Sequence, residues 1–447
     1  MTLRPYQIDT LSRTRDAIRR GVRAVLVQLP TGGGKTHLAA EGMIGPAAAR
    51  GWPVVWVSDL EEINTDTAQR LTTYGLRVGI VQSGRAPDRN AQVQVCSLQT
   101  LARYGERGET LPPARLVILD EAHVSSARTA REILAAYRQV GALVVGLTAT
   151  PARGDGQPLD EFEELVTGPS MRELIALGAL VPPRVLSPER VLDRGVCEDP
   201  VAAVLTRAAD RRCAVFAPDA ASAADIATRL TAEGHPTVAV LDGMGRDARK
   251  RVRDQLADGS VQSLVTVRAL VKGFDAPVLD CAVLCTLGSI TSYLQSIGRA
   301  LRAHLGKRDA LVLDLRGAVW VHGLPEEDRA WTLDGTQGKP HAAPAESLRR
   351  CRACHAIFSG AKTRCPRPGC GAVLVAHARG LKIQHAAMIE ASGASREDRA
   401  QRYHDAIRDR LLKAGKPSHV AERVARDATV KRFYSNNANH EEVRDVG

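Results

Sequence analysis

A glycine-rich segment near the N-terminus has the residue types that hold a phosphate. Residues 29–36 read LPTGGGKT and lie between an apolar run and a stretch at 36–50 that we predict to be helical. Glycines let backbone N–H groups curl around a phosphate, and the N-terminus of the following helix favours its negative charge. Lys35 would reach the β- and γ-phosphates of a nucleotide, and the Thr36 hydroxyl would bind Mg²⁺. Because the strict eight-residue pattern begins with Gly where this chain has Leu29, a glycine-rich turn without nucleotide is the alternative.

A pair of acidic residues follows another apolar run, RLVIL at 115–119. If that run is a buried parallel strand, its carboxyl end lies at the same edge of the sheet as the phosphate loop. Asp120 is then placed to hold the Mg²⁺ ion that Thr36 contacts, and Glu121 to polarise the attacking water as a general base. Adjacent acids in a loop are common. An apolar strand that ends in DEAH and follows a GKT loop, however, is a strong signal for a nucleotide site with Mg²⁺.

Four of the nine cysteines fall within 20 residues as two close pairs, and we predict that they bind one structural Zn²⁺. Each pair can supply two thiolates from a tight turn, which gives a closed tetrahedral site. Disulfides are disfavoured in a reducing cytoplasm, and a redox pair formed by the first two cysteines would leave the second two unexplained. His355 is an alternative ligand. The four predicted ligands are Cys351, Cys354, Cys365 and Cys370; the other cysteines are interpreted as core residues, namely Cys96, Cys197, Cys213, Cys281 and Cys285.

The elements that must position these residues are short apolar runs alternating with amphipathic stretches, a pattern that predicts parallel α/β sheets. In the N-terminal part, strands are predicted at 24–29, 53–58, 93–98, 115–120 and 143–148, and helices at 36–50, 61–74 and 127–139. The pattern pauses across 151–200, which is rich in Pro, Gly and charge. Further strands are then predicted at 213–218, 237–242, 263–268, 281–286 and 310–315.

We therefore predict an α/β fold with two tandem, doubly wound parallel-sheet lobes, a small zinc-binding module and a helical C-terminal tail. Residues 317–346 are rich in Gly, Pro and Asp and are interpreted as a linker, and residues 381–433 show helical periodicity. The predicted boundaries are 1–168 for lobe 1, 169–205 for a connector, 206–320 for lobe 2, 346–376 for the zinc module and 381–447 for the basic tail.

The net charge of +11 is concentrated near the C-terminus. Residues 341–447 hold 20 Lys/Arg and 11 Asp/Glu, whereas residues 1–340 hold 41 and 39. A basic appendage suits a polyanionic partner, with a solubilising tail as the alternative. No apolar run approaches the roughly 18–20 residues of a membrane span. The first residues form no apolar signal region, so we expect a cytoplasmic protein without a membrane partner.

The order of the motifs resembles that of superfamily 2 helicases. GKT, DEAH, the tripeptide TAT at 148–150 and QSIGRALR at 295–302 follow the family's motif series, and LRPYQ at 3–7 is similar to its adenine-recognition motif. With GLTATPAR at 146–153, LVTVRALVKGFDAP at 264–277 and the C-terminal cysteines, the series resembles the RadD-like branch of DEAH-type helicases. The helicase resemblance covers residues 2–316, and the cysteine module extends it to about 375.

This resemblance implies two RecA-like lobes with ATP bound between them. It implies that Gln7 reads the edge of adenine. It also implies that Thr148 and Thr150 couple the state of the nucleotide to lobe movement, and that His123 makes a polar contact with Gln295.

The resemblance assigns further roles to the second lobe. Gly273 and Asp275 would form a loop that senses nucleotide and nucleic acid. Arg299 and Arg302 would face the triphosphate, because a guanidinium stabilises developing phosphoryl charge. An exposed basic helix face is the alternative for these two arginines. The predicted nucleotide-binding residues are Arg4, Gln7, Thr31, Gly32, Gly33, Gly34, Lys35, Thr36, Gly273 and Asp275.

Two positions depart from the family pattern. The acidic segment DLEE at 59–62 stands where relatives usually carry a basic or Pro-Arg pair that touches the phosphate backbone. Lys272 stands where many relatives carry an acid or an arginine. Its ammonium either makes a phosphate contact that replaces the one missing at 59–62, or it is solvated.

The sequence thus predicts an ATP-dependent DNA helicase or translocase in repair, recombination or replication, with repair or replication proteins as partners. An RNA-dependent ATPase is a second interpretation, and DEAH with the RadD-like series favours DNA over RNA. A third is a non-hydrolysing clamp that grips nucleic acid with the lobes and the cysteine module. The presence of Lys35, Glu121 and Arg299 argues against a clamp.

Overall fold

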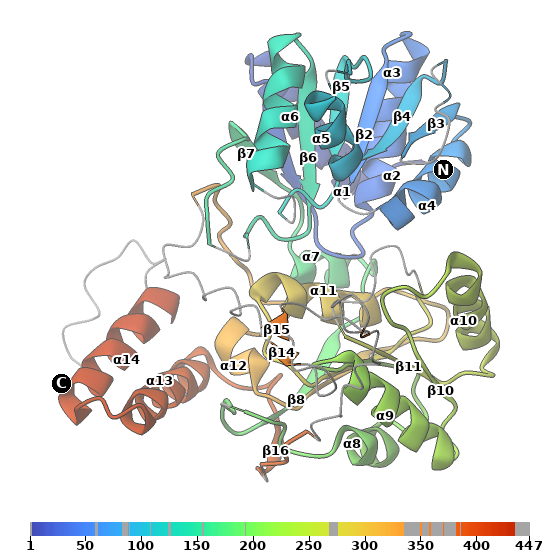
Figure 1. The fold of residues 1–447 in the computed structure, drawn as a ribbon. Helices are drawn as coiled ribbons and strands as arrows, with labels where there is room; N and C mark the ends of the chain where they lie inside the picture. The colour runs from blue at the N-terminus through green and yellow to red at the C-terminus, as the bar shows by residue number, and fades with distance from the viewer. Residues whose placement is uncertain are drawn as a thin grey trace.

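The computed structural model contains two lobes, each built on a seven-stranded sheet (Figure 1). It describes residues 2–58, 61–82, 88, 90–107, 109–123, 127–153, 156–192, 194–267, 276–334, 349–350, 357–358, 370, 381–384 and 386–433. Within these ranges, none of the helices is long and apolar enough to cross a membrane. The predicted class, two doubly wound parallel-sheet lobes, is confirmed.

The first lobe has a wholly parallel sheet with the strand order β3-β4-β2-β5-β6-β1-β7. Alternate residues of a strand point to opposite faces, so Val25 and Leu26 of β1 belong to two different core clusters. Both faces are therefore covered by helices, which explains the nearly continuous apolar runs. Its strands are β1 (Ala24–Gln28), β2 (Val54–Ser58), β3 (Val78–Val81), β4 (Val93–Ser97), β5 (Leu116–Leu119), β6 (Leu143–Thr148) and β7 (Glu164–Thr167). Its helices are α1 (Pro5–Arg19), α2 (Lys35–Ala39), a π-helical turn (Ala40–Ile44), α3 (Gly45–Ala49), α4 (Glu61–Thr72), α5 (Leu98–Glu106) and α6 (Ala127–Gln139).

The second lobe repeats this plan with the strand order β10-β11-β9-β12-β13-β8-β16, in which β16 alone is antiparallel to its neighbour. Cys213 and Ala214 of β9 likewise fall in different core clusters. The five cysteines predicted to be core residues are all buried. The strands are β8 (Pro183–Pro188), β9 (Cys213–Phe216), β10 (Thr237–Ala239), β11 (Ser263–Thr266), β12 (Cys281–Leu284), β13 (Ala310–Asp314) and β16 (Met388–Glu390). The helices are α7 (Met171–Ala176), α8 (Pro200–Arg207), α9 (Ala220–Ala232), α10 (Arg246–Asp258), α11 (Ile290–Ala300) and α12 (Ala318–His322).

Residues 151–205, where the sequence predicted no strands or helices, contain regular secondary structure. It includes β7 of the first sheet, and α7 and β8 of the second lobe, so the second sheet begins at Pro183 rather than after residue 205. The strand β8 lies between β13 and β16. Its two prolines and its partly exposed residues interrupt the apolar pattern, and this is why the sequence did not predict a strand there.

Residues 317–334, predicted as the start of a linker, belong to the second lobe. The carboxylate of Asp314 accepts hydrogen bonds from the backbone N–H groups of Arg316, Gly317 and Val319, and so fixes the start of α12. Trp320 of α12 is fully buried, and its indole N–H donates to the carbonyl of Pro188 at 2.6 Å. A single short helix in a Gly/Pro-rich stretch gives too few apolar positions to reveal this packing from sequence.

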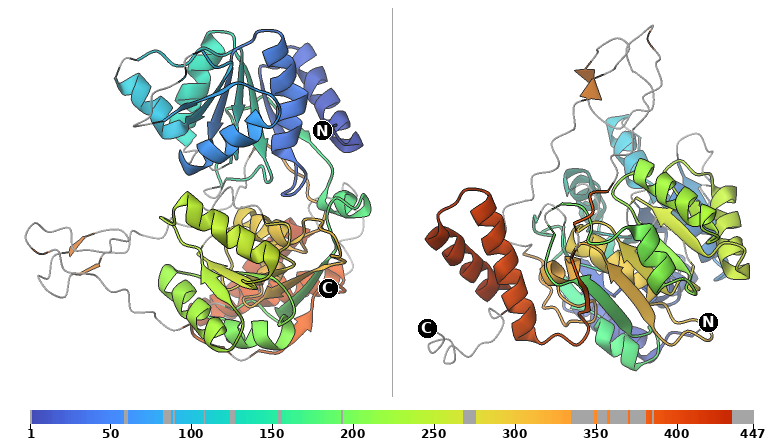
Figure 2. Two further views of the ribbon diagram at one scale, coloured as in Figure 1. Left: turned by 90° about the vertical axis from the view of Figure 1, so that its right-hand side faces the viewer. Right: turned by 90° about the horizontal axis from the view of Figure 1, so that it is seen from below.

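The C-terminal tail is only partly helical. Its first described residues include β16, which pairs with β8, and the helical hairpin α13 (Arg396–Lys413) and α14 (Ser418–Phe433) follows. Arg402 of α13 stacks over the ring of Trp320 at 4.9 Å and donates to the carbonyl of Glu189. The hairpin therefore lies beside the second lobe (Figure 2). A short pair, β14 (Arg349–Arg350) and β15 (Ile357–Phe358), falls in the cysteine-containing part of the sequence.

Candidate active site between the lobes

The predicted phosphate-binding loop, called the phosphate loop below, joins the end of β1 to the start of α2. Gly34 caps α2 with φ of +82°, a conformation that suits glycine. A Cβ atom at Gly34 would lie 2.6 Å from the side-chain nitrogen of Gln7, so a side chain here would collide with the loop's own support. The loop thus has the tight glycine turn before a helix N-terminus that phosphate binding requires.

Gln7, predicted to read adenine, holds the loop in this structure. It is 1% exposed, and its Nε2 donates to the carbonyls of Gly33 and Gly34 at 3.3 and 3.2 Å. Its Oε1 accepts from the backbone N–H of Arg4 at 2.9 Å. Tyr6, which the sequence did not single out, adds a hydrogen bond from its hydroxyl to the carbonyl of Gly33. Recognition of adenine by Gln7 remains a prediction.

The acidic pair lies next to the loop. Glu121 Oε1 is 3.8 Å from the ammonium of Lys35, and Asp120 Oδ1 accepts from the backbone N–H of Glu121. Glu121 has a φ of +49°. Among the described residues, it is the only non-glycine residue with a positive φ. Such strain at a loop is typical of functional positions. Asp120 and Thr36 stand at the carboxyl edge of one sheet, and a carboxylate with a hydroxyl is an oxygen donor set that suits Mg²⁺.

A chain of short polar contacts leaves the acidic pair through His123. The Nδ1 of His123 is 2.8 Å from the hydroxyl of Thr148 and 3.5 Å from Glu121 Oε2. The Thr148 hydroxyl donates to the carbonyl of Thr150 and accepts from its backbone N–H. All three side chains of His123, Thr148 and Thr150 are buried. These predicted coupling residues therefore form one connected group.

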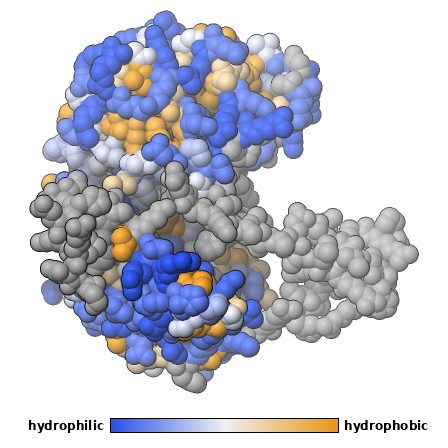
Figure 3. All heavy atoms as spheres, turned by 90° about the vertical axis from the view of Figure 1, so that its left-hand side faces the viewer, coloured by the Kyte–Doolittle hydropathy of each residue, from blue (hydrophilic) through white to orange (hydrophobic). Residues whose placement is uncertain are grey.

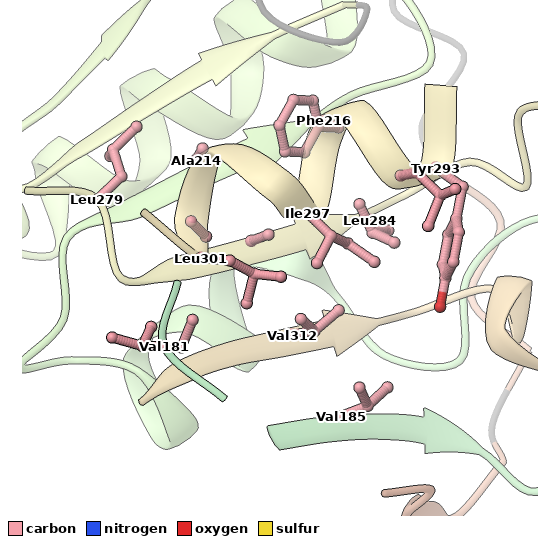
Figure 4. Packing of buried hydrophobic residues seen from close by; sticks show 14 of the residues in the cluster. Val181, Val185, Ala214, Phe216, Leu279, Leu284, Tyr293, Ile297, Leu301 and Val312 are labelled. Carbon is pink, nitrogen blue, oxygen red and sulfur yellow. The ribbon is translucent and has the colours of Figure 1, made fainter. Parts of the chain in front are cut away.

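Helix α11 of the second lobe closes the site from the other side. Tyr293, Ile297 and Leu301 share one face and pack into the core of their lobe (Figure 4). The opposite face carries Gln295, whose Nε2 is 3.3 Å from Glu121 Oε2 and 3.4 Å from His123 Nε2. Because an amide NH₂ group can only donate, the Nε2 of His123 accepts, and its Nδ1 carries the proton toward Thr148. The predicted contact between His123 and Gln295 is present.

The helix α11 also touches the phosphate loop directly. A Cβ atom at Gly298 would lie 2.6 Å from the Cβ of Thr31, so only glycine permits this close approach of the lobes. A Cβ atom at Gly32 would lie 2.7 Å from Leu180 and 3.6 Å from the Cγ of Arg302. The structure thus brings Arg302 next to the phosphate loop. Arg299 lies three residues earlier, in the last turn of α11.

Thr291, at the start of α11, is a site residue that the sequence analysis missed. Its hydroxyl accepts from the hydroxyl of Thr150 at 3.1 Å and donates to the carbonyl of Ala152 at 3.2 Å. Its position four residues before Gln295, on the same helix face, was the available signal. Threonine at a helix start has so many structural uses that the residue type alone gave no indication.

A segment after α12 crosses back from the second lobe to the first. Trp331 packs against the core of the second lobe, Leu333 packs against the first, and the carbonyl of Leu333 accepts from the N–H of Leu159. This segment lines a cavity of about 470 Å³ together with Thr31 and Thr150. Its lining residues do not include Lys35 or Glu121.

Several predicted site residues lie outside the described residues. These are Gly273 and Asp275, with Lys272, and three of the four predicted zinc ligands, Cys351, Cys354 and Cys365. The segment at 59–62 is described only as the start of α4 from Glu61. Among the residues that are described, no group of three or more His, Cys, Asp or Glu side chains could hold a metal ion. The zinc module remains a prediction.

Two families match the two lobes. Residues 1–153 match the family described as type III restriction enzyme, res subunit, and residues 198–304 match the helicase conserved C-terminal domain. The putative ATP-dependent helicase IRC3 of Saccharomyces cerevisiae is 25% identical over 359 residues, which cover 71% of this chain and 52% of that protein. The chain therefore spans about half the length of this relative.

Solved structures share the two-lobed fold. Dbp5 of S. cerevisiae, bound to RNA and ADP BeF3, matches with a TM-score of 0.51 and 16% identity over 72% of this chain and 90% of that one. The ATP-dependent type ISP restriction-modification enzyme LlaBIII, bound to DNA, matches with a TM-score of 0.53 and 16% identity over 70% and 27%. At these identities the likeness establishes the fold alone, which is that of two RecA-like lobes.

The two lobes hold the phosphate loop, the acidic pair and the arginine-bearing helix α11 between them. The first lobe is similar to a restriction-enzyme subunit, and the second is similar to the helicase conserved C-terminal domain. Over most of its length the chain is similar to the putative ATP-dependent helicase IRC3.

Proposed function

We propose that the protein hydrolyses ATP between its lobes and uses this cycle to move along or unwind DNA. The observation that supports this most directly is the contact of Gln295, in the second lobe, with both Glu121 and His123 in the first. The proposed base and the proposed coupling residues thus meet the other lobe at one point. A change at the nucleotide can therefore alter how the lobes are held together.

In the proposed reaction, Lys35 holds the terminal phosphates, and Thr36 with Asp120 holds Mg²⁺. When bound, Mg²⁺ would neutralise charge on the phosphate oxygens. Glu121 orients the attacking water and accepts its proton. Arg299 and Arg302 stabilise the charge that develops on the transferred phosphoryl group, and they do so only when the second lobe is in place.

The close packing of the phosphate loop gives a physical link between nucleotide and lobe position. Gly32 abuts Leu180 and lies next to Arg302. Because both side chains belong to the second lobe, phosphates bound in the loop would lie beside that lobe, so nucleotide binding can alter its position relative to the first lobe. A translocating motor needs such coupling. A ligand shifts the equilibrium between two conformations only if it binds them with different affinities.

We infer DNA as the nucleic acid from the family match of the first lobe. Restriction enzymes act on DNA, and residues 1–153 match a restriction-enzyme subunit. The DEAH tetrapeptide at 120–123 and the RadD-like motif series favour the same choice. A role in repair, recombination or replication, and partners from these processes, belong to this proposal. An RNA-dependent ATPase is the alternative within the same fold.

The C-terminal region would supply a nucleic-acid surface and a zinc site. Residues 335–380 hold eight Lys/Arg and one Asp/Glu, together with the four cysteines. Phosphate contacts from such residues strengthen binding without regard to base sequence. On the face shown in Figure 3, most of the described surface is hydrophilic, with apolar patches over the first lobe.

The test compares steady-state ATP hydrolysis alone and with single-stranded DNA, duplex DNA or RNA of equal length. We expect stimulation by DNA to exceed stimulation by RNA. If RNA but not DNA stimulates hydrolysis, the protein is an RNA-dependent ATPase instead. Nucleic-acid binding without hydrolysis under any condition would favour the clamp instead.

A further inference from the structure

The loop after α11 carries a lysine whose ammonium is surrounded by backbone carbonyls. Lys307 Nζ donates to the carbonyls of Leu279 at 2.6 Å, Arg302 at 2.8 Å and Pro277 at 3.4 Å. An ammonium has three N–H donors and no acceptor, so these three contacts use its whole capacity. The loop itself is a tight turn, closed by a hydrogen bond from the Lys307 backbone N–H to the carbonyl of His304.

The carbonyls that Lys307 joins belong to two segments of the proposed site. Arg302 lies just after the end of α11, and Pro277 and Leu279 directly follow the segment that contains Gly273 and Asp275. Leu279 is 1% exposed and belongs to the core cluster of the second lobe, so it provides a fixed anchor. The ammonium therefore connects the end of α11 to a rigid part of the lobe.

Two further backbone contacts hold the chain around Arg302. Arg302 forms an isolated bridge with Leu180, and the carbonyl of Leu301 accepts from the N–H of Val181. The last carbonyls of a helix lack partners within the helix, and a cation near them is favourable. A shift of the Arg302 backbone would move its side chain away from Gly32, to which it lies close.

We propose that Lys307 is a positioning residue for hydrolysis, because its ammonium ties Arg302 to residues 277–279 and thereby keeps the arginine directed at the phosphate loop. This inference rests on the proposed ATPase function. The three N–H donors of Lys307 are used on backbone carbonyls, so its loss should lower kcat more than it raises KM for ATP.

The charges around Lys307 make this device sensitive to pH. Asp280 and Asp309 face it from the starts of β12 and β13, and Arg211 and Arg302 from the approach to β9 and the end of α11. Burial is the main cause that lowers the pKa of Lys307 to about 8, with the arginines adding to it and the aspartates opposing it. A neutral amine has two N–H donors, so above this pH one of the three carbonyl bonds is lost.

Activity and stability should respond to this titration in opposite directions. Between pH of about 8 and the ordinary lysine pKa near 10.5, the unfolded chain binds more protons at this site than the folded one. The contribution of Lys307 to the free energy of unfolding therefore rises with pH in this window. A fall in kcat over the same window cannot then be attributed to unfolding caused by Lys307.

The test measures basal ATPase kcat and KM from pH 7 to 9.5, together with thermal unfolding, for the wild type, Lys307→Met and Lys307→Arg. We expect Lys307→Met to lower kcat by about tenfold at pH 7.5 with KM within about threefold. Lys307→Arg should restore most of kcat and remain flat to pH 9.5, where the wild type declines. Arg308→Met, a change at the exposed neighbour, is the matched control and should leave the profile unchanged.

The outcomes separate this inference from the proposed function. A wild type that hydrolyses no ATP overturns the ATPase assignment. A hydrolysing wild type whose kcat stays flat from pH 7 to 9.5 overturns the role of Lys307 alone, as does a folded Lys307→Met with normal kcat. If Lys307→Met fails to fold, the wild-type and Lys307→Arg profiles still decide.

Discussion

The hydroxyl of Thr150 in the first lobe donates to the hydroxyl of Thr291 in the second at 3.1 Å, and both side chains are buried. Thr150 is also bonded through Thr148 to His123, which contacts Gln295. Two bridges thus leave the same group of the first lobe and end on one helix, α11. Because buried hydroxyls are costly to leave unpaired, the lobes are favoured in relative positions that keep both bridges.

Replacing Thr291 by Val should weaken coupling between nucleic acid and hydrolysis. The change keeps the shape of the side chain but leaves the hydroxyl of Thr150 without its partner in the second lobe. Leaving this buried hydroxyl unpaired should destabilise the present arrangement of the lobes by roughly 1–3 kcal/mol. We expect the ratio of DNA-stimulated to basal ATPase rate to fall about tenfold or more. The matched control is Thr228→Val on α9, where the hydroxyl bonds only within an exposed helix. An unchanged ratio in Thr291→Val would show that this bridge transmits nothing.

Replacing Arg299 by Ala should lower kcat severely and leave nucleotide affinity within a few fold. An arginine that acts on the transition state of phosphoryl transfer is worth roughly 10³–10⁵ in rate. The measurements are single-turnover hydrolysis and equilibrium binding of a labelled ATP analogue. Normal DNA-stimulated turnover in the variant would assign Arg299 to an ordinary basic surface.

The alternation of apolar runs and helices was enough to predict both sheets, because interior parallel strands are buried on both faces. Strands that lie near sheet edges or contain proline, such as β3, β7, β8 and β16, were missed because their patterns are weaker. The helix α12 was missed because Trp320 is fixed by contacts with residues far away in sequence, including Pro188.

The chemistry-bearing residues were predictable where their types are restrictive, as for Lys35 and the acid pair at 120–121. Residues that act through geometry were not. Thr291 and Lys307 belong to common residue types, and only the fold reveals which carbonyls and hydroxyls they reach. Likewise, Gly298 matters because Thr31 of the other lobe lies against it.

The full-length protein should contain about one zinc ion per chain. Four thiolates in two close pairs suit a closed structural site, and metal binding at such sites is coupled to local folding. Metal analysis of protein purified without chelators should give a ratio near one, and a Cys351→Ser, Cys354→Ser double variant should give a ratio near zero. The double variant Cys213→Ser, Cys281→Ser serves as a control, since these buried residues lie in the core. Equal zinc content with and without Cys351 and Cys354 would contradict the site.

Replacing residues 335–380 by a Gly/Ser segment of equal length should weaken DNA binding and reduce its salt dependence. This replacement is preferable to truncation after Gly317, which would also remove Trp320 and β16 from the second lobe and destabilise it. For every phosphate that the protein no longer neutralises, the slope of log affinity against log salt should become shallower by about 0.7–0.9. Basal ATPase should persist. An unchanged slope would show that these residues do not bind phosphates.

The central claim, that Lys35 and Glu121 form an ATP-hydrolysing site, is tested most directly by comparing hydrolysis with binding. Single-turnover hydrolysis with saturating single-stranded DNA should fall by roughly 10²–10⁴-fold in Glu121→Gln, because the amide cannot accept the proton. The same variant should bind ATP as tightly as the wild type, whereas Lys35→Ala should lose both binding and hydrolysis. Wild-type hydrolysis in Glu121→Gln would contradict the account.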